Sequence, residues 1–189
     1  KTKEIKAIGR TLNIVRIGTS GSVQADIPVD SFVISEKSIG CDGVLRFYAN
    51  NESVCDHPFE EAFIRHCRWT PSAARPYVVN ADPGLADRLY DEEHTIKGVT
   101  LTAVGFYGPQ GRVLRLPLAM PGINDRITAF RYEGYKVTNY EMESAAITGL
   151  CNLLGHRAAT ICLIIANRIN GDASADYHSY MNKLIRYTL

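Results

Sequence analysis

The sequence predicts an α/β fold, a three-layer sandwich in which helices flank a central, largely parallel or mixed β-sheet. Short β-branched and apolar runs alternate with segments whose apolar residues recur at helical spacing. Ala159–Ala166 (ATICLIIA) is apolar throughout, as expected for a strand that is covered on both faces. Because no repeat or polar linker interrupts the sequence, we expect residues 1–189 to form one domain.

Four further segments have the composition of strands. Leu12–Ile17 (LNIVRI) is short, β-branched and apolar, and a Gly-rich stretch at 18–21 is expected to form its exit turn. Ser31–Glu36 and Val44–Ala49 are also strand candidates. Thr100–Tyr107 alternates in polarity and then reaches a Gly-Pro turn. Together with the apolar run above, these segments would supply the sheet.

Capping signals mark two helices in the first half of the chain. Asp-His-Pro at 56–58 places an acceptor and a proline where a helix should start. The apolar face of this helix is predicted to carry Phe59, Phe63 and Cys67. Asp-Pro at 82–83 begins a second helix, which is expected to run towards Glu93. Both helices would pack an apolar face on the sheet.

Two more helices are expected in the second half. Thr138–Glu141 (TNYE) fits a capping box, in which the Thr hydroxyl and the Glu carboxylate accept from exposed backbone N–H groups. The helix that it would start ends at Gly155. A last amphipathic helix is expected from about Ala173, with an apolar face formed by Tyr177, Met181, Leu184 and Ile185.

Composition excludes several classes of partner. Lys and Arg number 21 and Asp and Glu number 20, so no global charge would hold nucleic acid or an anionic membrane. No apolar run approaches the roughly 20 residues that cross a bilayer. The five cysteines include no CxxC pair, and two lie in segments predicted to be buried. Reduced thiols in a cytoplasmic protein are therefore the expectation.

Unusual polar residues follow four of the predicted strands, at the edge where ligands bind in such sheets. In the first, Arg16 ends an apolar strand and precedes Gly18, Thr19, Ser20 and Gly21. Small residues allow close backbone approach, and successive N–H groups with two hydroxyls can cradle an anion. The guanidinium adds a bidentate contact suited to phosphate. A tight turn with an exposed Arg is the alternative interpretation.

The second segment, Phe106–Arg112 (FYGPQGR), combines an aromatic ring with an amide and a guanidinium. Gln110 offers both a donor and an acceptor, and Arg112 offers donors only. Together they match the edge of a uracil-type ring, on which Phe106 could stack. An ordinary surface loop with one packed aromatic residue is the alternative.

The third segment contains Glu141, Met142 and Glu143. A carboxylate here could accept hydrogen bonds from ribose hydroxyls, with the Met side chain against the sugar. Alternatively, both acids only cap a helix and complement its dipole. In the fourth segment, Arg168 follows a buried strand and needs a partner or an exit to solvent, because an unpaired buried charge is costly. It could support the loop that reads the base.

Metal and cofactor motifs are not evident. Cys55-Asp56-His57 and His66-Cys67 contain possible zinc ligands, but their spacing matches no standard zinc module. Nothing resembles a phosphate-binding P-loop, a dinucleotide fingerprint or a nucleophile elbow. We therefore expect neither a metal nor an organic cofactor.

Taken together, the four segments resemble the nucleoside phosphorylase family, and within it the uridine phosphorylase branch. The resemblance rests on RIGTSG at Arg16–Gly21, FYGPQGR at Phe106–Arg112, NYEMES at Asn139–Ser144 and IANR at residues 165–168. It spans essentially the whole chain. It implies a nucleoside phosphorylase-like sandwich, reversible phosphorolysis of uridine to uracil and ribose 1-phosphate, and inorganic phosphate as a co-substrate.

The resemblance also implies a role for each site residue. Phosphate would be held by Arg16 and Thr19. Ribose would be positioned by Thr19, Glu141, Met142 and Glu143. The base pocket would be formed by Ser20, Gly21, Phe106, Gln110, Arg112, Ile165, Ala166 and Arg168, with Arg168 supporting Arg112. The catalytic residues would be Arg112, Glu143 and Arg16.

Two alternatives to uridine phosphorolysis stay open. A purine or methylthioadenosine-type phosphorylase or nucleosidase would use the same fold, but purine members typically carry an Asp where Ala166-Asn167-Arg168 stands. A non-catalytic nucleoside-binding protein is the other alternative. The family also begins with strands that carry a Gly-rich phosphate loop, a further Arg and a His, which do not lie upstream of Lys1. We therefore expect a chain that is partial at the N-terminus, and a homo-oligomer, either dimer or hexamer.

Overall fold

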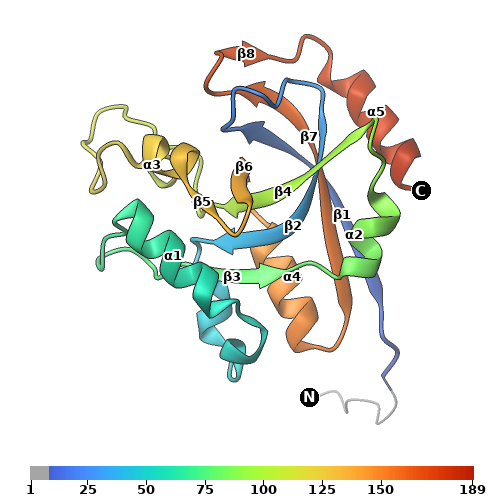
Figure 1. Cartoon of the computed structure of the whole chain (residues 1–189), viewed down its shortest axis with the longest axis horizontal. Coiled ribbons are helices and arrows are strands. Elements are labelled where there is room, and N and C mark those ends of the chain that lie inside the picture. Colours follow the sequence, from blue (N-terminus) through green and yellow to red (C-terminus); the bar gives the residue numbers. More distant parts are fainter. Residues whose placement is uncertain (1–8) are drawn as a thin grey trace, which may run out of the picture.

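A mixed eight-stranded sheet forms the centre of the computed structural model, which describes residues 9–189 (Figure 1). The strand order is β3-β2-β4-β6-β1-β7-β8, and β5 pairs with β6. The strands are β1 (Asn13–Ser22), β2 (Phe32–Gly40), β3 (Tyr77–Asn80), β4 (Thr95–Thr102), β5 (Arg131–Tyr132), β6 (Tyr135–Glu141), β7 (Arg157–Asn167) and β8 (Asp172–Ala173).

The sheet also curls back on itself, which the sequence did not predict. Parallel pairs join β1 to β7, β2 to β4 and β4 to β6. In addition, the start of β2 pairs antiparallel with β7, where Phe32 lies opposite Leu163 and Ser35 opposite Thr160. Strands β2, β4, β6, β1 and β7 therefore form a closed ring. This closure brings the ends of β1, β6 and β7 to one place.

Helices cover the sheet from several sides, which confirms the predicted mixed sheet flanked by helices. In Figure 1, α1 and α3 lie to the left of the strands, whereas α2 and α5 lie to the right. The helices are α1 (His57–Cys67), α2 (Pro83–Leu89), α3 (Ile123–Ala129), α4 (Ser144–Leu153) and α5 (Tyr177–Thr188). Three short 3₁₀ turns are η1 (Val44–Phe47), η2 (Asn51–Val54) and η3 (Gly108–Gln110).

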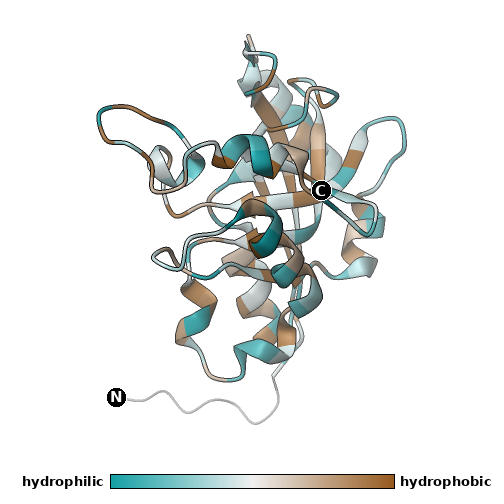
Figure 2. Ribbon diagram, turned by 60° about the vertical axis from the view of Figure 1, so that its left-hand side comes forward, coloured by the Kyte–Doolittle hydropathy of each residue, from teal (hydrophilic) through white to brown (hydrophobic). Residues whose placement is uncertain are grey.

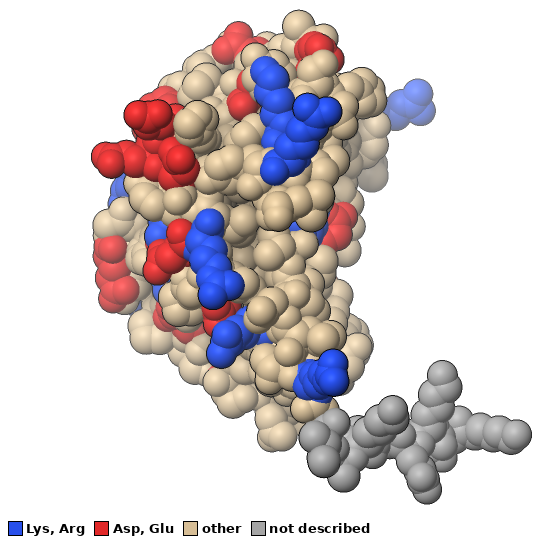
Figure 3. Space-filling model, turned by 90° about the vertical axis from the view of Figure 1, so that its right-hand side faces the viewer, with Lys and Arg blue, Asp and Glu red and all other residues tan. Residues whose placement is uncertain are grey.

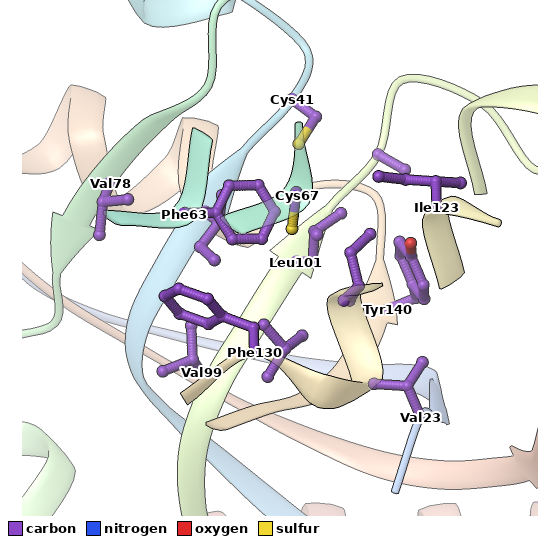
Figure 4. Packing of buried hydrophobic residues seen from close by; sticks show 14 of the residues in the cluster. Val23, Cys41, Phe63, Cys67, Val78, Val99, Leu101, Ile123, Phe130 and Tyr140 are labelled. Atoms are coloured by element: carbon purple, nitrogen blue, oxygen red, sulfur yellow. The ribbon is translucent and has the colours of Figure 1, made fainter. Parts of the chain in front are cut away.

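Helix α1 forms as its capping signal predicts. The Asp56 side chain accepts from the Phe59 N–H at 3.3 Å, and a proline occupies the first turn. Phe59, Phe63 and Cys67 are all fully buried, as their spacing predicts. Figure 4 shows Phe63 directed at the core between the sheet and Phe130. The burial of several aromatic rings here stabilises the contact of α1 with the sheet.

The predicted strand Val44–Ala49 is wrong, because residues 44–47 form the 3₁₀ turn η1. Gly43 enters the turn with a φ of 72°, and Leu45 alone is buried. Arg46 then donates to the Glu60 carboxylate and to the Pro76 carbonyl oxygen, each at 3.3 Å. These tertiary contacts outweigh the β propensity of a short segment.

The predicted exit turn at 18–21 is also wrong, because β1 continues through it. Gly18 lies opposite Cys162 and Ser20 opposite Ile164 in the parallel pairing with β7, and the register shifts between Ser20 and Gly21. The long ladder with β7 satisfies the backbone groups that a turn would otherwise expose. This bulge next to the strand end is a feature that often directs side chains into a site.

The predicted capping box at Thr138–Glu141 is wrong as well, since these residues end strand β6. Helix α4 begins only at Ser144. Glu141 still caps the helix, but from outside it, by accepting from the N–H groups of Glu143 and Ser144 at 2.8 Å each. The sequence therefore correctly predicted that Glu141 caps a helix, but it predicted the wrong residues as the hydrogen-bond partners of Glu141.

Several boundaries differ from the prediction by a few residues. The helix expected to reach Glu93 ends at Leu89, and the strand expected to reach Tyr107 ends at Thr102. The last helix begins at Tyr177, after Asp176, whose side chain accepts from the Ser179 N–H. On α5, Leu184 is buried as predicted, whereas Tyr177 and Ile185 are exposed.

The surface mixes both signs of charge. Basic and acidic side chains are interspersed over the face that Figure 3 shows. Figure 2 shows hydrophobic residues recurring along the central strands and hydrophilic residues on the outer helices. Among residues 9–189, every helix is too short or too polar to cross a bilayer. All five cysteines are free.

Candidate active site

One cavity of about 300 Å³ collects every residue that the sequence analysis assigned to phosphate, ribose or base. Its lining is formed by Arg16, Thr19, Ser20, Gly21, Phe106, Gln110, Arg112, Tyr140, Glu141, Met142, Glu143, Ile165, Ala166 and Arg168. Tyr140 is the member of this lining that the sequence analysis did not assign. Tyr140 lies within the NYEMES segment. Because this segment was interpreted as a helix cap, the sequence did not show that Tyr140 lines the cavity.

Strand pairing explains why these distant segments meet. Gly21 of β1 lies opposite Ala166 of β7 and, on its other side, opposite Tyr140 of β6. The connection between β4 and α3 carries Phe106, Gln110 and Arg112 to the same edge. The site is thus assembled from three strand ends and one loop, as is typical of ligand sites in such sheets.

Arg16 lies between two carboxylates at one end of the cavity. Its Nη1 is 3.2 Å from Glu141 Oε2, and its Nη2 donates to Glu143 Oε2. The Arg16 side chain is 14% exposed, and that of Glu143 is 54% exposed. Gly18 leaves the space for this arrangement, since a Cβ there would lie 2.7 Å from Arg16 Nη1. Glu143 is therefore the more accessible of the two acidic partners.

A thiol completes the surroundings of Arg16. Nη1 also donates to Cys162 Sγ at 3.3 Å. Burial raises the pKa of Cys162 to about 12, so the sulfur is a neutral thiol at physiological pH. The positive charge of Arg16 is therefore balanced by the carboxylates and not by a thiolate.

Glu141 is held entirely by protein contacts. Beyond Arg16 and the two N–H groups of α4, its Oε1 accepts from Thr102 Oγ1 at 2.5 Å. The side chain is 1% exposed. This carboxylate therefore fixes both Arg16 and the start of α4. Its assignment to ribose stays a prediction.

Glu141→Gln should lower the free energy of unfolding by about 2 kcal/mol, because the amide loses the charge and turns one NH₂ group towards donors. Urea denaturation followed by circular dichroism measures this loss. The matched variant Glu143→Gln alters an exposed side chain and should change stability by less than about 0.5 kcal/mol. Equal losses in the two variants would contradict the capping role of Glu141.

The opposite end of the cavity is built around Gln110. Its side chain is buried, its Oε1 accepts from Arg168 Nη2, and its backbone oxygen accepts from Arg168 Nη1 at 3.3 Å. The sequence analysis expected Arg168 to support Arg112, but in the structure Arg168 instead holds Gln110. The two guanidiniums cannot bond to each other, since both only donate.

Electrostatics distinguish the two guanidiniums. Burial, together with the charge of Arg112, lowers the pKa of Arg168 to about 10. The face of Tyr140 lies 4.5 Å from the Arg168 guanidinium carbon and offsets part of this cost. Within the described residues, Arg168 Nε is buried and finds no hydrogen-bond partner. Gly21 lies against it, because a Cβ at Gly21 would be 3.2 Å from Nε.

Arg112 is held more loosely. Its Nη1 donates to the Phe106 carbonyl oxygen at 2.9 Å, and its guanidinium carbon lies 3.7 Å from the centre of the Phe106 ring. Phe106 is itself 53% exposed. Both contacts are local to the loop, so Arg112 can turn towards a ligand without disturbing the core.

The remaining lining is apolar or hydroxylic. Half-buried Ile165 and Ala166 line the cavity, as does the exposed side chain of Met142. Ser20 is fixed by the Asn139 amide, which donates to its Oγ at 2.9 Å. The cavity therefore has a charged end, a donor-rich end and an apolar wall between them.

A second, larger cavity of about 950 Å³ adjoins the site and shares Arg112 and Tyr140 with it. It lies under the connection between β4 and α3 and is lined mainly by apolar side chains, including Trp69 and Leu116. Converging polar groups, rather than volume, identify a site for a polar ligand. We therefore assign the chemistry to the smaller cavity. Among the described residues, no cluster of three His, Cys, Asp or Glu side chains could hold a metal.

Comparison with known proteins identifies the family and the fold. The model of the Phosphorylase superfamily matches residues 3–186. A nucleoside phosphorylase from Trypanosoma brucei, described as showing uridine phosphorylase activity, superimposes with a TM-score of 0.80 at 23% identity. The match covers 93% of this chain and 62% of that one. This similarity confirms the fold.

Curated relatives point to the same family. Uridine phosphorylase from Thermococcus kodakarensis is 27% identical over 176 residues, which cover 90% of this chain and 53% of the relative. Uridine phosphorylase A from Schistosoma mansoni is 36% identical over 160 residues, covering 84% of this chain and 49% of the relative. An inactive uridine phosphorylase B from the same organism is 34% identical over 105 residues, covering 50% and 32%.

The chain spans about half the length of these curated relatives. The superfamily model nevertheless covers nearly all of it. The chain belongs to the Phosphorylase superfamily.

Proposed function

We propose that this chain carries the base and ribose site of a uridine phosphorylase, which splits uridine with inorganic phosphate into uracil and ribose 1-phosphate. One observation carries the proposal. The Gln110 amide and the guanidiniums of Arg112 and Arg168 face the same cavity of about 300 Å³ as the Arg16–Glu143 ion pair. The cavity thus pairs a donor-rich end with a charged end.

The donor-rich end suits the edge of a uracil ring. Because Gln110 Oε1 accepts from Arg168, the Gln110 amide is oriented, and its Nε2 is left to donate to a base carbonyl oxygen. The second lone pair of Oε1 remains for the N3–H of uracil. Arg112, which lines the same cavity, supplies further donors for the carbonyl oxygens.

The charged end suits phosphate and ribose. The Arg16 guanidinium offers donors to phosphate, with the Thr19 hydroxyl beside it. Once phosphate occupies Arg16, the exposed Glu143 carboxylate is released to accept from a ribose hydroxyl. Met142 would lie against the sugar. In this scheme phosphate binding and ribose binding are coupled, because both depend on the Arg16–Glu143 ion pair.

The chemistry follows from where charge develops. Phosphate oxygen forms a bond to ribose C1′ as the bond from C1′ to uracil N1 breaks, through an oxocarbenium-like transition state. The bonding pair leaves with uracil, and its negative charge spreads over O2 and O4. Donors aimed at these atoms bind the transition state more tightly than the ground state, which lowers the barrier. The negatively charged Glu143 carboxylate would stabilise the positive charge that develops on the sugar.

Preference for a pyrimidine rests on residues 166–168. Asn167 is buried and donates to the carbonyl oxygens of Gln24 and Ile27, so its side chain is committed to the fold. Ala166 and Arg168 line the cavity, and of these two only Arg168 has a polar side chain that could contact a base. Because the Arg168 guanidinium already donates to Gln110, it is not available as the partner that a purine N7 would need.

Uracil release tests the proposal, and it should be measured with the natural full-length protein, with and without phosphate, alongside inosine. We expect release from uridine only when phosphate is present. Release without phosphate would indicate a nucleosidase, and release from inosine alone would indicate a purine enzyme. Binding of uridine without release would indicate a non-catalytic protein. Each of these three results would overturn the proposal.

A cytoplasmic location, the absence of a cofactor, a role in pyrimidine salvage and assembly into a dimer or hexamer belong to the same proposal. They are supported by the resemblance to the family and by the free cysteines. Size-exclusion chromatography with light scattering measures the assembly. A monomer with full activity would contradict the oligomeric part alone.

A further inference from the structure

Asn124 lies in α3, outside the lining of the site, yet it joins two of the elements that form it. Its Nδ2 donates to the carbonyl oxygens of Gln110 and Gly111, at 3.2 and 3.3 Å. Its Oδ1 accepts from the Tyr140 hydroxyl at 3.0 Å. Every polar atom of this side chain is therefore used to connect the loop with β6.

We propose that Asn124 is a positioning residue for the base site, which sets the aim of Gln110 and Arg112 without touching the substrate. This inference rests on the proposed function. It extends that function by naming the residue that pre-organises the donors expected to bind the leaving uracil.

The loop needs such a tether because it has little structure of its own. Residues 108–110 form a single 3₁₀ turn, and Gly111 follows with a φ of 69°. The next apolar residues, Val113 and Leu114, are exposed. A Cβ at Gly111 would lie 2.5 Å from Asn124 Nδ2, so the close approach of this amide requires glycine there.

The contacts form a closed circuit through four elements. Arg168, directly after β7, holds Gln110, Gln110 is held by Asn124 from α3, and Asn124 is held by Tyr140 from β6. The Tyr140 ring then lies against the Arg168 guanidinium. The donors expected to bind the base are therefore held both by Arg168 at the end of the strands and by Asn124 of helix α3.

The direction of each hydrogen bond in the circuit is determined. Burial raises the pKa of Tyr140, so its hydroxyl stays protonated and donates to Asn124 Oδ1. The Asn124 amide is thereby oriented with Nδ2 towards the loop. Figure 4 shows Tyr140 packed near Ile123, the residue that precedes Asn124. Because both polar atoms of the half-buried Asn124 side chain are satisfied, the network favours one arrangement of the loop.

Asn124→Ala should lower kcat/KM for uridine by about 10 to 10²-fold, since misplacing catalytic donors by a fraction of an ångström is costly. The Kd for phosphate, measured by calorimetry without nucleoside, should change by less than about twofold, because Arg16 and Thr19 lie on β1. The double variant Asn124→Ala/Gln110→Ala should lose less than the product of the two single losses, because residues that act through one another are not additive.

Two further variants sharpen the test. Tyr140→Phe keeps the ring under Arg168 but removes the hydroxyl that orients Asn124, and a smaller loss in the same direction is expected, about three- to tenfold. The matched control is Asn152→Ala on α4, where an Asn amide likewise donates to a backbone oxygen, that of Asn80 at 3.0 Å. This control should retain wild-type kinetics.

The outcomes separate the inference from the function on which it rests. Wild-type protein that releases no uracil overturns the proposed function. Wild-type activity with an Asn124→Ala effect below twofold, or with an equal loss of phosphate affinity, overturns the positioning role alone. If Asn124→Ala does not fold, Tyr140→Phe decides: a selective loss in kcat/KM for uridine supports the role, and unchanged kinetics reject it.

Discussion

Replacing Arg112 with Ala is expected to lower kcat/KM for uridine phosphorolysis by about 10² to 10³-fold, the usual cost of removing one hydrogen-bond donor from a developing anion. The guanidinium donates to the Phe106 carbonyl oxygen and stacks on the Phe106 ring. Because both contacts are exposed and local, the free energy of unfolding should change by less than about 1 kcal/mol. Steady-state kinetics and urea denaturation measure the two quantities.

Arg115 provides the matched control, since it is an exposed Arg three residues along the same loop that faces the larger cavity. Arg115→Ala should keep wild-type turnover. A second measurement asks whether Arg112 acts on leaving-group charge. With 5-fluorouridine, whose base leaves more readily, Arg112→Ala should lose less activity than it loses with uridine. Unchanged phosphorolysis of uridine by Arg112→Ala would remove this residue from the mechanism.

Local signals in the sequence predicted most of the helices correctly. Asp56 and Asp82 each accept from the N–H group three residues later, as expected of an acceptor before a helix. Gly155 follows α4 with a φ of 72°, which a glycine adopts without strain. These signals act over a few residues, so they can be recognised without the tertiary structure.

Strand ends were predicted less well, because long-range pairing determines them. Glycines at 18 and 21 favour a turn in isolation, but the parallel ladder with β7 extends β1 through them to Ser22. In the same way, the TNYE segment has the residues of a capping box, yet it pairs with β4 and ends a strand. Closure of the sheet through β2 and β7 depends on register, which local composition does not encode.

The residues of the site could be recognised in the sequence because their side chains have the polar chemistry that a ligand requires. The residues that hold them in place could not be recognised in this way. An Arg after an apolar strand or a Gln-x-Arg loop is unusual enough to notice in the sequence. Tyr140 and Asn124 look like ordinary residues of a strand and a helix. Tyr140 and Asn124 are 16 residues apart in the sequence, and their importance appears only when folding brings both of them to the same loop.

The two acids of the NYEMES segment show the same distinction between support and chemistry. Glu141 is buried among donors from Arg16, Thr102 and the start of α4, whereas the side chain of Glu143 is more than half exposed and, within residues 9–189, bonds to Arg16 alone. A carboxylate committed to four protein donors has little capacity left for a ligand. We therefore expect ribose recognition to depend on Glu143 and folding stability to depend on Glu141.

Glu143→Ala should lower kcat/KM for uridine by about 10²-fold, because a hydrogen bond to a charged acceptor contributes roughly 1.5–3 kcal/mol. The loss with 2′-deoxyuridine should be about tenfold smaller, since that substrate lacks the hydroxyl that Glu143 is expected to bind. Parallel kinetics on the two nucleosides measure the difference. The exposed Glu61, which pairs with Arg75 far from the cavity, is the matched control. Its Ala variant should behave as wild type on both substrates.

Equal losses on both nucleosides would contradict the ribose role and would leave Glu143 as a partner of Arg16 only. In that case the damage should appear in phosphate binding, because Arg16 would lose the acid that holds it in place between ligands. The Kd for phosphate therefore distinguishes the two roles. If Glu143 serves ribose, removing it frees Arg16 and phosphate should bind at least as tightly as in the wild type. If Glu143 only orients Arg16, phosphate should bind more weakly.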